Sequence, residues 1–265
     1  MPIPHLPPEI IDYIVDFLHD DQTTLKECCL VSKSCVPRTR RYLFAGIKIR
    51  SERDIRLWAK LSQGDENSLA RHTRTLSIYC PELVVEADAG EGGWIRAFSN
   101  VESLDVNNGA WPDECPLTPF HGVSPSLKSL RVGPIILPSS QLFYLIRSSP
   151  LLEDLTVVGD TESSSDEPSV DDNNPHLEAP GVPVISPPFS GSLDFDIYGG
   201  MRSTVRQLLD LPNGLRFRKL TFSWDVEEDL RWITDLVMEC SDTLEFLYVS
   251  HSSRGVFIWH PHPHR

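Results

Sequence analysis

The chain has 265 residues, of which 40% are hydrophobic and 23% are charged, and its formal net charge is −14. A chain of this length buries about 70–75% of the surface that its unfolded form exposes, so it can fold without disulfides or a structural metal. Its acidity argues against nucleic acid as a partner, because phosphate binding depends on Lys and Arg. No apolar run reaches the ~20 residues of a membrane-spanning helix, so we expect no insertion into a membrane.

The N-terminal segment has no basic leader, and Asp12 and Asp16 interrupt its apolar residues, so export is not expected. The six cysteines form no C-x-x-C pair, which is typical of free thiols in a reducing compartment. We therefore expect an intracellular protein of the cytoplasm or nucleus. These cysteines are Cys28, Cys29, Cys35, Cys80, Cys115 and Cys240.

Three short helices are predicted before residue 46. The first should begin at about Pro8, because proline is tolerated in a first helical turn and Glu9 is favoured there by the helix dipole. Asp20–Thr24 supplies turn and N-cap residues for a second helix that ends before Pro37, and a third should cover about 38–44. The first helix carries an apolar stripe of Ile10, Ile11, Ile14, Val15 and Leu18, with Glu9, Asp12, Asp16 and His19 on its other side.

Such a small helical unit cannot bury much surface alone, so part of this apolar stripe should face a partner or the following domain. The run from Leu6 to Phe44 resembles an F-box, most closely the expanded F-box family of mushroom-forming fungi. It matches in the L-P-x-E-I opening, in Leu30-Val31-Ser32-Lys33 and in the closing Leu43-Phe44, and it departs at Cys35, where many F-boxes have a large residue.

The resemblance implies that this region docks a Skp-type adaptor and, through it, a cullin of an SCF-type ubiquitin ligase, while the rest of the chain binds a client protein. The alternative is a helical cap in which Leu6, Ile10 and Ile14 pack inward on the rest of the chain. The adaptor-binding residues that the resemblance implies are Leu6, Pro7, Glu9, Ile10, Ile14, Leu18, Leu25, Leu30 and Val31.

A repeated Leu-x-apolar pattern follows residue 69. Successive anchors are 25–28 residues apart, except for 38 residues between Leu155 and Leu193. This period lies within the range of leucine-rich repeats, in which each unit supplies one short parallel strand. The Asn or Cys that commonly follows such strands is missing at Gly109, Ile135, Asp160, Asp225 and Ser252, so the repeats are irregular. The anchors are Leu76, Leu104, Leu130, Leu155, Leu193, Leu220 and Leu247.

Helices are predicted between the strands, with apolar residues at 142–146, at 205–209 and at 230–240, the last after a capping signal at Asp225 and Glu228. The predicted fold is thus α/β: a three-helix F-box at 4–46, a linking helix at 51–68 and an irregular leucine-rich-repeat-like solenoid at 69–258. An open α/β domain with βαβ crossovers remains the alternative. Residues 160–188 form an acidic and then Pro-rich insertion that we expect to be disordered, and 259–265 a flexible tail.

No phosphate-binding, dinucleotide-binding, hydrolase or zincin motif occurs, so neither an enzyme nor a cofactor is expected. His260, His262 and His264 are interpreted as part of the tail rather than as a metal site. Residues 1–50 carry a net charge near +1 and the rest near −15, which would favour a basic client. The F-box resemblance therefore implies a substrate-recognition subunit of a ubiquitin ligase, and the alternative is a repeat scaffold for protein–protein interaction without ubiquitination.

Overall fold

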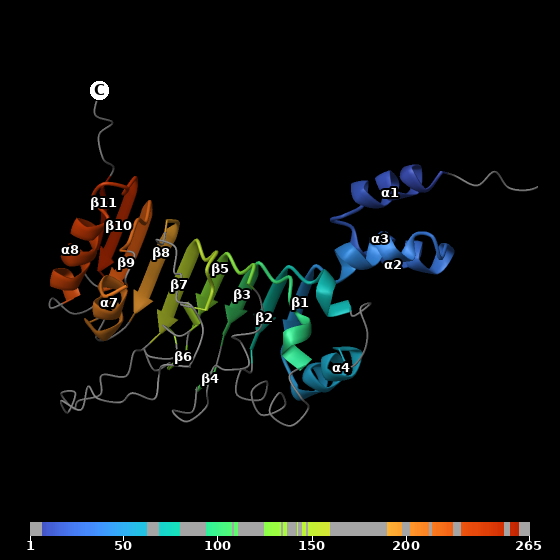
Figure 1. Cartoon of the computed structure of the whole chain (residues 1–265), viewed down its shortest axis with the longest axis horizontal. Coiled ribbons are helices and arrows are strands. Elements are labelled where there is room, and N and C mark those ends of the chain that lie inside the picture. Colours follow the sequence, from blue (N-terminus) through green and yellow to red (C-terminus); the bar gives the residue numbers. More distant parts are fainter. Residues whose placement is uncertain are drawn as a thin grey trace, which may run out of the picture.

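The computed structural model is a mixed α/β protein in which three helices precede a long parallel sheet (Figure 1). The helices α1–α3 lie at one end of the sheet, and α7 and α8 lie at the other. The structure describes residues 7–62, 69–79, 94–107, 109–110, 125–133, 135–136, 142, 145–146, 148–159, 190–197, 202–211, 214–224, 229–251 and 255–259.

The three N-terminal helices are α1 (Pro8–Phe17), α2 (Gln22–Val31) and α3 (Val36–Leu43), so the prediction of three helices here is confirmed. Proline occupies the first turn of α1, as expected. The carboxylate of Asp21 caps α2 by accepting hydrogen bonds from the backbone N–H groups of Thr23 and Thr24, at 3.1 and 3.0 Å. Among the described residues α1 and α2 each pack on α3, which in turn contacts the short helix η1 (Leu69–His72).

Nine strands form one sheet in which the spatial order follows the chain order. Eight are parallel, and the last pairs antiparallel with its neighbour. The strands are β1 (Gly46–Ile49), β2 (Thr75–Ile78), β3 (Ser103–Val106), β5 (Ser129–Val132), β7 (Asp154–Gly159), β8 (Ser192–Ile197), β9 (Lys219–Trp224), β10 (Phe246–His251) and β11 (Gly255–Trp259).

The anchor leucines lie in one row across the sheet. Each is in register with the anchor of the neighbouring strand, from Leu76 opposite Leu104 to Leu220 opposite Leu247, and Leu193 takes its place in the same row. The prediction that these segments are parallel neighbours is confirmed. The 38-residue spacing before Leu193 therefore contains an insertion and leaves the register of the row unchanged.

Helices cover the face of the sheet from which the anchors project. Side chains alternate between the two faces of a strand, so the anchor and the residue two positions later enter one core in every repeat. The helices that contribute are α4 (Glu52–Ser62), η2 (Trp94–Ala97), α7 (Arg202–Leu209) and α8 (Asp229–Glu239), with Leu142, Leu145 and Ile146, which are helical and buried. The helix predictions at 205–209 and 230–240 are confirmed in α7 and α8.

The first and last strands were not predicted from the sequence. Ile47 of β1 pairs in register with Leu76, 29 residues further on, so β1 supplies an extra unit of the row. The helix expected as a link at 51–68 is α4, whose Ile55 and Trp58 are buried in the core shared with the sheet. Two of the positions that lack the usual Asn or Cys, Gly109 and Ile135, pair with each other through the backbone. Gly109 lies in β4 (Gly109–Ala110) and Ile135 in β6 (Ile135–Ile136).

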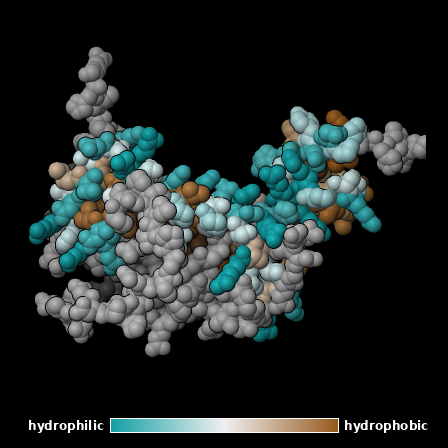
Figure 2. Space-filling model, in the orientation of Figure 1, coloured by the Kyte–Doolittle hydropathy of each residue, from teal (hydrophilic) through white to brown (hydrophobic). Residues whose placement is uncertain are grey.

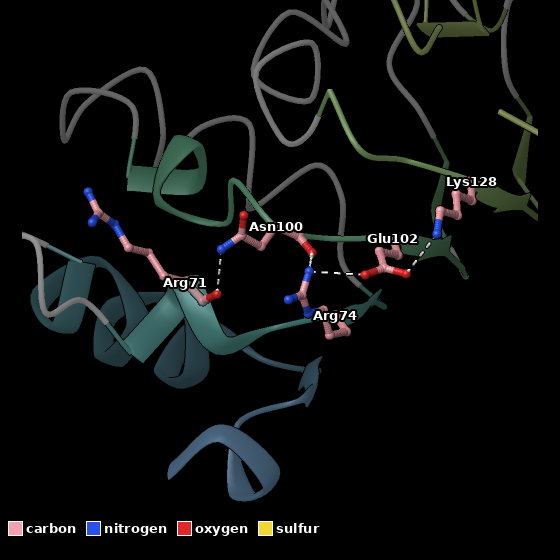
Figure 3. Close-up of polar contacts among 5 residues, drawn as sticks. All are labelled: Arg71, Arg74, Asn100, Glu102 and Lys128. Carbon is pink, nitrogen blue, oxygen red and sulfur yellow. Dashed lines mark hydrogen bonds and ion pairs between the residues drawn. The ribbon is translucent and has the colours of Figure 1, made fainter. Parts of the chain in front are cut away.

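A row of charged residues follows the edge at which the strands begin (Figure 3). Arg74, Glu102 and Lys128 each precede the first residue of a strand, and the Glu102 carboxylate contacts Arg74 Nη1 at 3.0 Å and Lys128 Nζ at 3.3 Å. Glu153 continues the alternation. From Glu102 onward, the backbone N–H of each member donates to the carbonyl of the preceding member at 2.8 Å. The charged row follows the register that the backbone pairing of the strands gives. The predicted insertion at 160–188 lies outside the described residues.

Candidate protein-interaction site

The outer face of α1 is apolar and exposed. Ile10, Tyr13, Ile14 and Phe17 follow the spacing i, i+3, i+4 and i+7, which places them on one side of the helix. Their exposed fractions are 46%, 72%, 44% and 81%. A helix face with this spacing of apolar side chains is the form in which partner grooves bind helices.

The end of α2 adds a second apolar group to the same unit. Leu30 and Val31 are 88% and 84% exposed. Six of the eleven large apolar side chains that are exposed among the described residues thus belong to α1 and α2, and Figure 2 shows hydrophobic surface over both helices. We call these six residues the docking surface: Ile10, Tyr13, Ile14, Phe17, Leu30 and Val31.

The residues that the F-box resemblance implies as adaptor-binding divide between surface and interior. Leu25, a residue of α2, is fully buried, and Leu18 is partly buried. The exposed residues are Pro7, Glu9, Ile10, Ile14, Leu30 and Val31. Leu25 therefore supports the docking surface from below and is not itself accessible in the free chain. Leu6 lies outside the described residues.

Tyr13 and Phe17, the two most exposed apolar side chains of α1, were not predicted from the sequence. The helical spacing from Ile10 to Phe17 was the signal that could have identified them. The predicted stripe also combines two sides of α1. Ile10 and Ile14 face outward and are exposed. On the inward side Val15 is fully buried, and Ile11 and Leu18 are partly buried. Periodicity identified the apolar residues without separating these two sides.

A polar cluster joins α1 to α3. The Asp16 carboxylate accepts hydrogen bonds from Arg38 Nε at 2.6 Å, from Arg38 Nη2, and from the Tyr42 hydroxyl at 2.7 Å. Arg38 and Tyr42 are four residues apart, so they lie on the same side of α3. We call Asp16, Arg38 and Tyr42 the staple. Asp16 was expected on the side of α1 opposite the stripe, and in the structure its carboxylate bonds two residues of α3.

The staple determines how Asp16 titrates. Its hydrogen bonds from Arg38 and then Tyr42 lower the pKa of Asp16 to about 2. Since an unfolded Asp has a pKa near 3.9, its contribution to stability is complete above about pH 4 and is lost as the pH falls through 2. A carbon-13 NMR titration of the Asp16 carboxyl should therefore give a midpoint near 2, which Arg38→Gln should move upward. A midpoint near 4 in the unaltered chain would contradict the staple.

The face of the sheet opposite the anchors is the second candidate surface. The positions that follow the anchors form a mostly polar row that includes Asp105, Arg131, Asp194 and Tyr248. Arg131 Nε lies 3.8 Å from Asp105 Oδ1. Burial raises the pKa of Asp194, Lys219 opposes that rise, and Asp196 adds to it. This row carries charged groups of both signs, of which the Arg131 side chain is about half exposed and the Asp105 side chain about one-quarter exposed.

Comparisons with family models, with curated proteins and with solved structures gave no match. None of the described helices is long and apolar enough to cross a membrane. The four described cysteines, Cys28, Cys29, Cys35 and Cys240, are free thiols. Cys80, Cys115 and the histidines of the predicted tail lie outside the described residues.

Proposed function

We propose that this chain is the substrate-recognition subunit of an SCF-type cullin-RING ubiquitin ligase. Helices α1–α3 act as an F-box that docks a Skp-type adaptor, and the region from β2 onward acts as an irregular leucine-rich-repeat-like solenoid that holds a client protein. The chain itself carries no catalytic residue in this proposal. The observation that carries it is the exposure of the docking surface, of whose six residues the F-box resemblance assigns Ile10, Ile14, Leu30 and Val31 to adaptor binding.

Exposure of the docking surface separates the two interpretations of the N-terminal helices. A helical cap would bury Ile10 and Ile14 against the sheet, yet both are more than two-fifths exposed. The core that the sheet shares with α4, α7 and α8 contains no residue of α1, α2 or α3. A partner that covers the docking surface therefore fits these helices better than a cap does.

The sheet supports the second half of the proposal. Its strands follow one another in chain order with the anchors in one row, which is the arrangement that stacked repeats produce and that a doubly wound sheet, with its reversal of strand order, does not. One face is covered by helices, and the opposite face carries the polar row. A client bound on the polar row would lie apart from the docking surface.

A repeat scaffold without ubiquitination remains the second candidate. It shares the polar row of the sheet with the first proposal and differs in leaving α1–α3 without an adaptor. The discriminating observation is therefore the identity of the protein that covers the docking surface.

The proposal is tested by purifying the tagged chain from cells that express it and identifying its partners by mass spectrometry, in parallel with a chain that starts at Ala45. This boundary keeps β1 and α4 with the sheet. We expect the Skp-type adaptor and a cullin with the full chain alone, and clients with both chains. Recovery of clients without adaptor or cullin from the full chain would favour the scaffold instead.

A further inference from the structure

Helix α1 is bound to the rest of the protein by very little apolar contact. Val15 is its one fully buried side chain, at 1% exposure, and four of its large apolar residues point to solvent. Among the described elements, α1 packs mainly against α3. An isolated ten-residue helix is unstable in water, so α1 needs another attachment to stay folded in place.

The staple supplies that attachment with favourable geometry. Arg38 binds both carboxylate oxygens of Asp16, and this paired arrangement fixes the angle between the two groups as well as their distance. The Tyr42 hydroxyl donates a third hydrogen bond to the same carboxylate. The ring of His19, at the end of α1, lies 6.2 Å from the ring of Tyr42. Asp16 and Arg38 are each about one-third exposed, so water competes for their charged groups. Because Arg38 donates two hydrogen bonds to the carboxylate, this ion pair is stronger than an ordinary surface ion pair.

We propose that Asp16, Arg38 and Tyr42 are positioning residues, which hold α1 on α3 and thereby set the orientation of its apolar face relative to Leu30 and Val31. The effect on adaptor binding rests on the proposed function. The attachment of α1 to α3 does not depend on it. None of the three residues belongs to the docking surface. They act on a partner through the placement of α1.

The test uses the full chain with Asp16→Asn, Arg38→Gln and the two together. Hydrogen exchange measured by mass spectrometry follows residues 8–17 and the sheet separately, and titration calorimetry gives the affinity for the Skp-type adaptor. Asp12→Asn is the matched control, because it also removes a carboxylate from α1. Asp12 affects Arg38 through its charge alone, whereas Asp16 also accepts hydrogen bonds from Arg38. The swap of Asp16→Arg with Arg38→Asp tests rescue.

We expect each single change to speed amide exchange in α1 by about 3–10-fold and to weaken adaptor binding by a similar factor. Sheet exchange should stay unchanged, the double change should be no worse than either single one, and the swap should restore part of the loss. Asp12→Asn should leave α1 exchange within about twofold. A general structural role would speed sheet exchange as well.

The two proposals fail in different ways. If Asp16→Asn leaves α1 exchange at the level of Asp12→Asn, or if the single effects add in the double variant, the staple does not hold α1 and the inference is overturned. If α1 exchange responds as expected while even the unaltered chain binds no adaptor, the attachment of α1 is supported and the proposed function fails.

Discussion

Replacing Phe17 and Leu30 together by alanine is expected to weaken binding of the Skp-type adaptor at least tenfold. Both side chains are more than four-fifths exposed in the free chain, so they are available to become buried anchors. Truncating such anchors costs about 2 kcal/mol or more in typical interfaces, and a tenfold loss corresponds to about 1.4 kcal/mol. The fold should be retained, because neither residue belongs to a core. Titration calorimetry measures the affinity, and circular dichroism checks the fold.

The matched control is Met238→Ala with Leu151→Ala. These side chains are also apolar and exposed, at 67% and 52%, but they lie on α8 and just before β7. Their loss should leave adaptor affinity within about twofold. Equal effects of the two pairs would mean that adaptor binding does not use the docking surface.

The second large effect is on stability. Gly133 follows β5 with a φ of +127°, and a Cβ built there would lie 1.7 Å from the carbonyl oxygen of Val158 in β7. Its N–H also donates to the Val106 carbonyl at 2.8 Å, so the backbone cannot simply move away. Gly133→Ala should lower the free energy of unfolding by about 3 kcal/mol or more, since it combines an unfavourable φ with a backbone clash. Thermal unfolding should shift down by roughly 6–12 °C.

Gly46→Ala provides the comparison. Gly46 begins β1 without a positive φ, and nothing lies within 4 Å of a Cβ at this position. Its replacement should change the unfolding free energy by no more than about 0.5 kcal/mol. A Gly133→Ala chain as stable as the Gly46→Ala chain would contradict the close packing of β5 and β7.

The sheet could be predicted because its signal repeats. A single Leu-x-apolar segment is ambiguous, but seven of them, 25–28 residues apart except before Leu193, indicate both the strands and their register. Leu193 takes its place in the row despite the longer spacing. β1 was missed because Gly46–Ile49 has Ile47 where the other strands have an anchor leucine, so it lacks the Leu-x-apolar pattern. β11 pairs antiparallel with β10 and therefore falls outside the period.

The candidate site was harder to predict because it depends on what covers each side of a helix. The apolar residues of α1 were identified from the sequence, but the same pattern includes Val15, which is buried, and Ile14, which is exposed. The link between Asp16 and Arg38 spans 22 residues, and a carboxylate on the polar side of a helix gives no sequence signal that distinguishes such a partner from solvent. These features require the packing of α1 on α3 to be known.

The most direct test of the central claim is reconstitution from purified proteins. The full chain is co-expressed with a Skp-type adaptor and the N-terminal domain of its cullin, and the products are analysed by size-exclusion chromatography with light scattering. An established F-box protein serves as the positive control. The proposed function predicts one complex with a single copy of each of the three proteins. Elution of this chain alone, under conditions in which the positive control assembles with adaptor and cullin, would contradict it.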